Sequence, residues 1–163
     1  AQGLESIYKD EVQLLWQTGA YYFADYREYA EKYPNNIIKA TAFIEDMALA
    51  YKAADLVISR AGAGTVSELC LLKMPTILVP SPHVAEDHQS KNAQALVNDN
   101  AAILVKDAET KQKLIPEALK YATDENALKT LSKNIYKHAE QNSAERIVDE
   151  LMKLIDKSKN KCF

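Results

Sequence analysis

Residues 55–68 read DLVISRAGAGTVSE: a short apolar run, a loop with two of the chain's four glycines, and the start of an amphipathic stretch. This pattern predicts a strand over 55–59 that leads directly into a helix over 62–72. Glycine allows a sharp turn and lets a ligand approach the backbone closely. A helix start presents free N–H groups that favour a phosphate, so the loop fits either a phosphate site or an empty tight turn.

Apolar runs and amphipathic stretches alternate along the rest of the chain in the same way. Nearly all-apolar strands separated by helices predict an α/β fold, a Rossmann-like doubly wound parallel sheet with helices on both faces and a helical C-terminal extension. We expect one domain over residues 1–163, with 143–163 as a C-terminal helix and tail. The expected strands are 12–16, 37–40, 55–59, 75–80 and 102–105, and the expected helices are 21–33, 47–54, 62–72, 87–98, 114–121, 126–140 and 143–157.

The overall composition argues against several classes of protein. The chain has 163 residues with 47% hydrophobic content, which suffices for one globular core. Its 20 Lys and Arg residues against 23 Asp and Glu residues give a net charge of −3, so we expect no nucleic-acid partner. No apolar run approaches the roughly 20 residues of a membrane helix, and residues 1–10 lack the apolar stretch of a signal peptide. We therefore expect a soluble chain in a reducing cytoplasm.

The cysteines and histidines predict neither a metal site nor a cofactor. Cys70 and Cys162 are too few for a disulfide framework or a metal cluster. His83, His88 and His138 show no paired-ligand spacing. Cys70 lies among leucines, which indicates a small buried hydrophobic residue rather than a nucleophile.

A glutamate after the glycines suggests how a nucleotide would be held. Residues 62–67 have the spacing Gly-x-Gly-x-x-Ser, which is similar to a dinucleotide-binding fingerprint. That fingerprint has glycine or alanine at the third position, where this chain has serine, and an acidic residue at the end of the next strand, which the expected strand 75–80 lacks. Glu68 follows Thr65 by three residues, so both side chains share one face of the first helical turn. Its carboxylate either accepts hydrogen bonds from two adjacent ribose hydroxyls or simply offsets the helix dipole.

Three segments in this order resemble the C-terminal domain of glycosyltransferase family 28. They are FIEDM at 43–47, AADLVISRAGAGTVSE at 53–68, and a third over 75–93 that ends in VPSPHVAEDHQSKNA. The similarity is dense from residue 12 to 105 and looser over the helical tail. It implies a GT-B enzyme with two Rossmann-like domains, of which the second holds UDP-N-acetylglucosamine (UDP-GlcNAc) and the first holds a lipid acceptor.

The resemblance also implies roles for individual residues. The backbone of Ile44 would pair with the uracil edge, residues 63–65 would face the diphosphate, and Glu68 would bind the ribose hydroxyls. Residues at the start of the next helix would reach the GlcNAc hydroxyls, and Gln17 and Gly19 resemble a further loop near the donor. The candidate donor-binding set is Ile44, Gly62, Ala63, Gly64, Thr65, Val66, Ser67, Glu68 and, for the sugar, His88, Gln89 and Asn92.

The family implies a reaction that we do not expect this chain to perform alone. Transfer of GlcNAc to lipid I would form lipid II for peptidoglycan synthesis at the cytoplasmic face of the bacterial inner membrane. The acceptor site, the general base and the membrane contact belong to the family's N-terminal domain. The first C-domain strand and its Gly-Gly-Ser loop also precede the residues matched here. His88 stands where some members have glutamine. Without an Asp-x-Asp pair near the loop, the helix start at 62–65 would stabilise the leaving diphosphate.

Other interpretations remain open. The chain could be a stand-alone subunit of a split GT-B transferase, a sugar-nucleotide epimerase or other GT-B transferase, or a non-enzymatic Rossmann module that binds NAD. The C-terminal helix either packs on its own domain or crosses to the N-terminal domain, which would leave its stripe beyond Leu151 exposed here or paired with a second copy. That stripe is Ile147, Val148, Leu151, Leu154 and Ile155.

Overall fold

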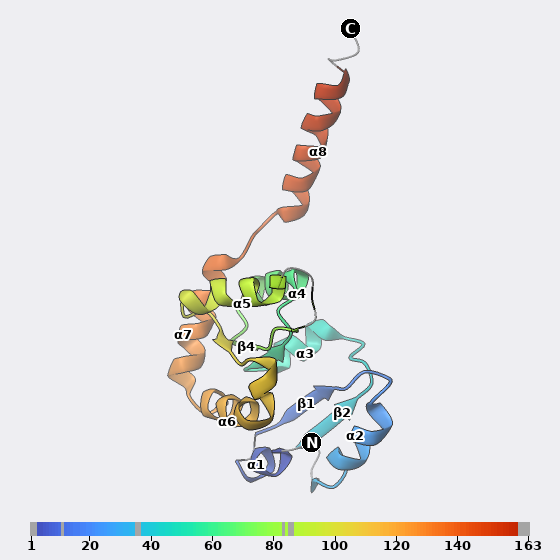
Figure 1. Cartoon of the computed structure of the whole chain (residues 1–163), viewed down its shortest axis with the longest axis vertical. Helices are drawn as coiled ribbons and strands as arrows, with labels where there is room; N and C mark the ends of the chain where they lie inside the picture. The colour runs from blue at the N-terminus through green and yellow to red at the C-terminus, as the bar shows by residue number, and fades with distance from the viewer. Residues whose placement is uncertain (1–2, 11, 35–36, 83, 85–86, 160–163) are drawn as a thin grey trace.

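A computed structural model describes residues 3–10, 12–34, 37–82, 84 and 87–159 (Figure 1). Every predicted strand and helix has a counterpart among these residues. The 3-10 turns η3 (Asp107–Glu109) and η4 (Tyr136–His138) precede α6 and follow α7. The strands are β1 (Leu14–Gln17), β2 (Ile38–Thr41), β3 (Val57–Ser59), β4 (Thr76–Leu78) and β5 (Ile103–Leu104). The α-helices are α1 (Leu4–Lys9), α2 (Phe23–Ala30), α3 (Met47–Ala53), α4 (Ala63–Leu71), α5 (His88–Asn98), α6 (Thr110–Ala122), α7 (Glu125–Ile135) and α8 (Ser143–Lys159).

The described strand pairs are all parallel, as predicted, and they form two hydrogen-bonded sheets. β1 pairs with β2 in a register that places Leu14 beside Ile38. The second sheet has the order β3-β4-β5, with Val57 beside Thr76. Over the described residues, no ladder joins the two sheets. The loops after β1, β2, β3 and β4 carry the candidate residues, as expected for ligand sites at the carboxyl ends of parallel strands.

The strand β4 is buried on both faces. Residues 76–78 all have 0% of their surface exposed. Because side chains alternate along a strand, Leu78 packs with Leu69 in a cluster beneath α4 and α5, whereas Ile77 packs with Val105 and residues of α6. Helices therefore cover both faces of this sheet, which confirms the doubly wound α/β prediction.

A separate core lies under the β1–β2 sheet and includes a helix that was not predicted. Leu4 and Ile7 of α1 are buried against Ile38 and residues of α6. A Cβ added to Gly3, which has a φ of +95°, would lie 2.9 Å from the Ile115 side chain, so the start of α1 approaches α6 closely. Two apolar residues on a six-residue helix are too few for the periodic pattern that reveals longer helices.

The predicted helix ends differ from the observed ones by a few residues. α2 is shorter than the expected 21–33. α6 begins earlier than residue 114 because η3 leads into it, and the Thr110 hydroxyl donates to the Asp107 carbonyl at 2.8 Å. α7 begins after Asp124, whose carboxylate accepts the N–H groups of residues 126 and 127 at 3.0 Å.

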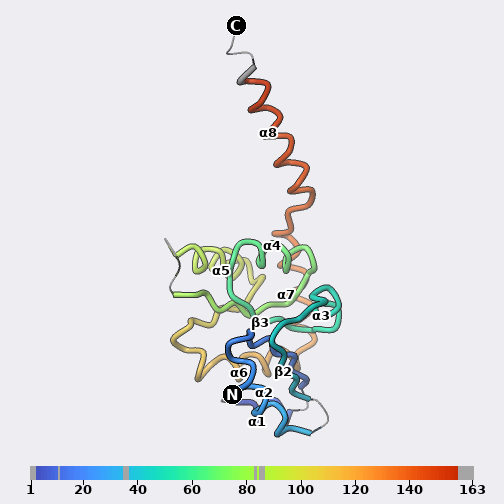
Figure 2. The backbone as a smooth tube through the Cα atoms, turned by 90° about the vertical axis from the view of Figure 1, so that its right-hand side faces the viewer, coloured from blue at the N-terminus to red at the C-terminus, as the bar shows by residue number. Residues whose placement is uncertain are grey.

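The last helix, α8, projects away from the rest of the molecule (Figures 1 and 2). Every side chain from residue 141 to 157 is exposed, including the apolar stripe: Ile147 is 61% exposed and Leu154 is 62% exposed. The interpretation that α8 packs on its own domain is therefore wrong for this structure. Within the described residues, no helix is both long and apolar enough to cross a membrane.

Candidate functional site

Residues 60–65, called the glycine loop below, connect β3 to the first turn of α4. Gly62 precedes α4 with φ −66° and ψ 144°, an extended conformation that any residue adopts. A Cβ added at Gly62 or at Gly64 would meet no heavy atom within 4 Å. Neither backbone conformation nor internal packing requires glycine at these two positions. The open space in front of them favours the phosphate interpretation over the tight turn.

The start of α4 presents backbone N–H groups at this open space. The first N–H groups of a helix have no partner within the helix, and among the described residues no side chain caps α4. Ala63 and Gly64 are exposed and Thr65 is half-buried. Val66 differs, because its side chain packs against the core. The amides of this turn, together with the helix dipole, form an anion-binding arrangement.

Glu68 lies on α4 one turn beyond Thr65. The helix begins at Ala63, so Glu68 occupies the second turn, and the prediction that it shares the first turn is wrong. This position weakens the dipole explanation, since that effect falls off within the first turn. The Glu68 side chain is exposed, and its Oε2 accepts a hydrogen bond from the Tyr51 hydroxyl at 3.3 Å.

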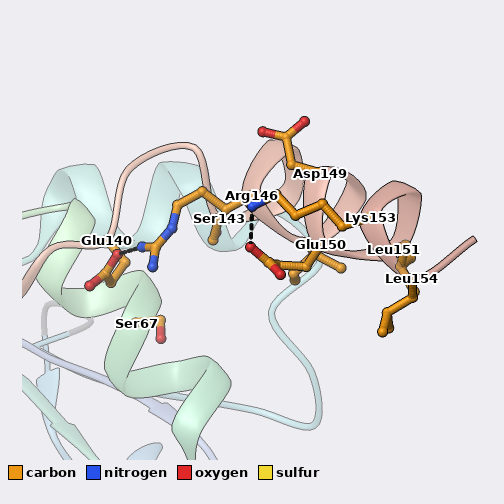
Figure 3. A pocket seen from close by; sticks show the side chains of 10 residues that line it. Ser67, Glu140, Ser143, Arg146, Asp149, Glu150, Leu151, Lys153 and Leu154 are labelled. Atoms are coloured by element: carbon orange, nitrogen blue, oxygen red, sulfur yellow. Dashed lines mark hydrogen bonds and ion pairs between the residues drawn. The ribbon is translucent and has the colours of Figure 1, made fainter. Parts of the chain in front are cut away.

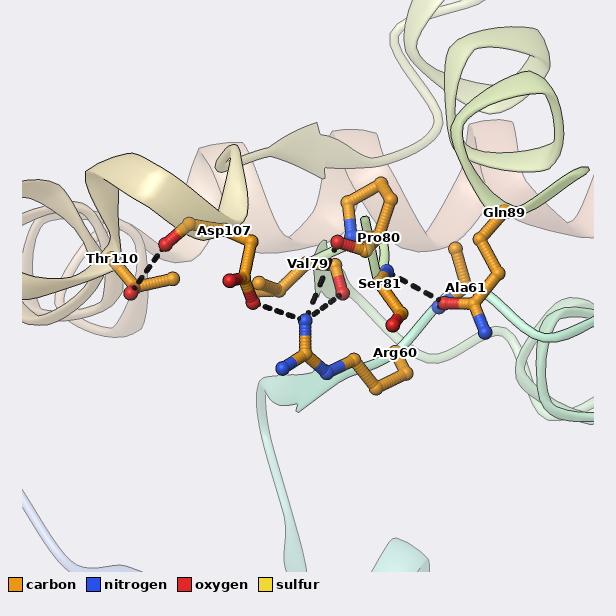
Figure 4. Close-up of polar contacts among 8 residues, drawn as sticks. All are labelled: Arg60, Ala61, Val79, Pro80, Ser81, Gln89, Asp107 and Thr110. Atoms are coloured by element: carbon orange, nitrogen blue, oxygen red, sulfur yellow. Dashed lines mark hydrogen bonds and ion pairs between the residues drawn. The ribbon is translucent and has the colours of Figure 1, made fainter. Parts of the chain in front are cut away.

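Gln89 and Asn92, on α5, contact the glycine loop directly, and Figure 4 shows the Gln89 contacts. The Ala61 N–H donates to Gln89 Oε1 at 3.3 Å, and the Ser81 N–H donates to the same oxygen at 2.9 Å. The Asn92 side-chain amide donates to the Ala61 carbonyl at 3.1 Å. Side chains of α5 therefore bind both the N–H and the carbonyl of Ala61. His88, the first residue of α5, is exposed at the same end of the helix.

The uracil candidate Ile44 lies in the loop after β2, beside the end of β1. Its N–H donates to Gln17 Oε1 at 2.8 Å. This contact places Gln17 beside Ile44, and the nearness of both residues to a donor stays a prediction. Gly19 has a φ of +78°, a left-handed conformation that favours glycine. Asp46 then caps α3 by accepting the Leu49 N–H at 2.8 Å, so the Ile44 loop leads into the helix that carries Tyr51.

Arg60 ties together the ends of three strands, a role that the sequence did not reveal (Figure 4). Its Nη1 donates to the carbonyls of Val79 and Pro80 at 3.2 and 3.3 Å, and to Asp107 Oδ1 at 2.5 Å. These contacts link the glycine loop to the ends of β4 and β5. An arginine next to a glycine loop is a visible sequence signal, but its partners lie 19 to 47 residues away.

Other candidate residues lie outside this cluster. Ser67 faces a shallow groove between α4 and α8, which Arg146, Glu150 and Leu154 also line (Figure 3). Cys70 is 2% exposed, and burial raises the pKa of its thiol, which confirms the prediction of a small buried hydrophobic residue.

The histidine and metal predictions are tested only within the described residues. These contain no group of three or more His, Cys, Asp or Glu side chains placed to hold a metal ion. His138 Nε2 lies 3.0 Å from Asp99 Oδ2, so this histidine pairs with a single carboxylate. His83, Ala85 and Glu86 of the third resembling segment, and Cys162, lie outside the described residues.

The fold and the loop define a Rossmann-like domain in which the start of α4 faces open space, and comparison with known proteins gives its family. The profile of the glycosyltransferase family 28 C-terminal domain matches residues 2–151. The chain therefore belongs to the family of glycosyltransferase family 28 C-terminal domains.

Individual relatives agree with this assignment. The chain is 51% identical over 154 residues to the UDP-N-acetylglucosamine--N-acetylmuramyl-(pentapeptide) pyrophosphoryl-undecaprenol N-acetylglucosamine transferase of Parabacteroides distasonis, covering 94% of this chain and 42% of that protein. It is 54% identical over 151 residues to the protein of the same name in Bacteroides fragilis, covering 91% and 39%. The chain thus spans about two fifths of the length of these curated relatives.

Solved structures show the same fold. The crystal structure of Acinetobacter baumannii MurG has a TM-score of 0.77 and 26% identity, covering 93% of this chain and 49% of that one. The solution structure of ALG13 has a TM-score of 0.52 and 19% identity, covering 75% and 73%, which is a likeness of fold alone.

Proposed function

We propose that this chain is the donor-binding domain of an N-acetylglucosaminyltransferase, an inverting hexosyltransferase of the GT-B class that uses UDP-GlcNAc. The open space in front of Gly62 and Gly64 carries the proposal, because neither fold nor packing explains these glycines and a diphosphate would fill the space. The relatives' names supply the acceptor, an N-acetylmuramyl-(pentapeptide) pyrophosphoryl-undecaprenol.

Each part of the donor has a candidate partner. The diphosphate would accept hydrogen bonds from the first amides of α4, and the Glu68 carboxylate would accept those of the ribose hydroxyls. Uracil would pair with the Ile44 backbone, which requires Gln17 Oε1 to release the Ile44 N–H. His88, Gln89 and Asn92 at the start of α5 would face the GlcNAc hydroxyls.

In the proposed reaction, the acceptor's C4 hydroxyl oxygen bonds to the anomeric carbon of GlcNAc while the bond from that carbon to UDP breaks. The hydroxyl proton goes to a general base outside this chain, and the configuration inverts. The helix start at residues 62–65 stabilises the negative charge that develops on the leaving diphosphate, so no metal is required.

The acceptor, the membrane and the base belong to a second domain in this proposal. The product would be lipid II, made for peptidoglycan synthesis at the cytoplasmic face of the bacterial inner membrane. We expect the 163-residue chain to show no turnover with UDP-GlcNAc and a lipid I analogue. Turnover by this chain alone would overturn the two-domain proposal.

Calorimetric titration of the chain with UDP-GlcNAc, UDP and NAD tests the donor site. We expect UDP binding and no NAD binding. Glu68→Ala should lose about 2–3 kcal/mol of UDP binding free energy, or about 30- to 150-fold in affinity, and Glu68→Gln should lose less.

Glu125→Ala, an exposed glutamate in the first turn of α7, is the matched control and should leave UDP affinity unchanged. If Glu68→Ala binds UDP within about threefold of the parent but loses thermal stability, the ribose assignment is wrong. NAD binding without UDP binding would replace the proposal with a dinucleotide-binding module.

The exposed apolar face of α8 supports a second candidate, a stand-alone subunit that docks on a separate acceptor subunit. Such a face needs a partner in either case, since most of a helix's stability in a protein comes from packing of its amphipathic face. Transferase activity reconstituted by mixing this chain with a separately expressed acceptor subunit would favour the split enzyme.

A further inference from the structure

Tyr51 reaches from α3 to the glutamate of the candidate ribose site. Its ring is half-buried and packs against the core cluster beneath α4, so the position of the ring is set by apolar contacts. Its hydroxyl extends to the exposed rim of the cluster and donates to Glu68 Oε2 at 3.3 Å. A rigid donor from one helix therefore meets a flexible acceptor on the next.

This contact restricts the carboxylate and leaves acceptor capacity open. An exposed glutamate has several rotamers, and ordering it for a ligand costs conformational entropy. A hydrogen bond from a fixed hydroxyl lowers that cost by preordering the side chain. Oε1 of Glu68, and one lone pair of Oε2, stay available for the two hydroxyls of a ribose.

The protonation state of Tyr51 suits this arrangement. Burial, and then the negative charge and hydrogen bond of Glu68, raise the pKa of the Tyr51 hydroxyl above its ordinary value. The hydroxyl is therefore a donor throughout the neutral range. Glu68 accepts from it with the same carboxylate that would accept from a ribose.

We propose that Tyr51 is a positioning residue that fixes the Glu68 carboxylate for the ribose hydroxyls and so sets the preference for ribonucleotides over deoxyribonucleotides. This inference rests on the proposed function. Tyr51 does not touch the donor in this scheme and acts through Glu68. Its helix starts just after the Ile44 loop, so one short element connects the uracil and ribose ends of the nucleoside site.

The test compares UDP with 2′-deoxy-UDP by calorimetric titration of the parent chain, Tyr51→Phe, Glu68→Ala and the double variant. We expect the parent to prefer UDP by about tenfold, the value of one charge-assisted hydrogen bond. Tyr51→Phe keeps the ring and should reduce the preference to about threefold or less, because UDP loses more affinity than 2′-deoxy-UDP, which contacts Glu68 only through its 3′ hydroxyl. In the Glu68→Ala background, the same change should alter UDP affinity by less than about twofold.

A matched control is Tyr33→Phe, since Tyr33 is also half-buried but packs on Tyr8, in the core of the other sheet. It should leave the UDP preference unchanged. If Tyr51→Phe lowers thermal stability while the preference stays within about twofold of the parent, Tyr51 is structural only and the inference is overturned. If the parent binds neither nucleotide, the proposed function fails first, and the inference fails with it.

Discussion

Replacing Gln89 by methionine tests whether α5 holds the glycine loop in place. The substitution keeps the length of the side chain but removes the oxygen that accepts the Ala61 and Ser81 N–H groups. Ala61 has 0% of its surface exposed, so water cannot easily take over its hydrogen bond. The variant therefore leaves two backbone donors without the partner on which they depend.

The size of the effect follows from these two contacts. A buried donor left without a partner costs about 1–3 kcal/mol. Ser81 is only half-buried and the Ala61 contact is long at 3.3 Å, so the sum should lie near the lower end. We expect a loss of about 2–3 kcal/mol of folding free energy, which for a chain of this length lowers the thermal midpoint by about 4–12 °C.

Gln89→Glu separates the structural role of this residue from sugar binding. Both groups that face Oε1 are N–H donors, so the amide nitrogen points away from the loop and is free to donate to a sugar hydroxyl. A carboxylate keeps the two acceptor contacts but loses that donor. Stability should stay within about 1 kcal/mol of the parent, whereas the affinity ratio of UDP-GlcNAc to UDP should fall about fivefold.

The measurements are thermal unfolding followed by circular dichroism, and titration with both ligands. Taking the ratio to UDP cancels the repulsion between the new carboxylate and the diphosphate. Gln94→Met is the control, because Gln94 is exposed on α5 and its side-chain amide donates to Asn98 Oδ1, one turn further along the same helix. A midpoint for Gln89→Met within about 1 °C of the parent would show that the two Gln89 contacts do not stabilise the loop.

Three further predictions concern the rest of the structure. Arg60→Met should lower the thermal midpoint by about 2–4 °C, a modest loss because the side chain is half exposed. Asp107→Asn in the Arg60→Met background should lower the midpoint little further, and additive losses would refute the coupling of the two residues. In the Cys162→Ser protein, a thiol reagent should label Cys70 only after unfolding, because the thiol is buried and its pKa is raised; rapid labelling of the native chain would contradict this. Removing residues 143–163 should change the midpoint by less than about 2 °C, because α8 is exposed, and a larger loss would show that α8 packs on the domain.

Local sequence patterns predicted most of the fold. The apolar run at 75–80 identified β4, which is buried on both faces, and the alternation of runs identified the parallel α/β class. The patterns did not reveal α1, because its packing on α6 depends on a contact between Gly3 and Ile115 more than a hundred residues apart in sequence. Strand order also lies beyond local patterns, since it is set by how the helices pack.

The sequence predicted which loops form the candidate site, but it did not predict the hydrogen bonds between them. The predicted helix start at residue 62 lies one residue before the observed start of α4 at Ala63. The hydrogen bond of Tyr51 to Glu68 and those of Gln89 and Asn92 to Ala61 join different elements. Their geometry depends on how α3, α4 and α5 pack, which residue spacing along the chain does not determine.

The division into two sheets has a consequence for how the molecule opens. The Ile44 loop follows β2 of the β1–β2 sheet. The glycine loop follows β3 of the other sheet and leads into α4, which carries Glu68. Each sheet packs on its own core. Cooperative units of this kind exchange their amide hydrogens at different rates, and the half-exposed β1 should open before the buried β4. A nucleotide held at both Ile44 and the glycine loop would bridge the two units. The ligand-free protein should therefore show two levels of protection from amide exchange, whereas the protein with bound donor should open as a single unit.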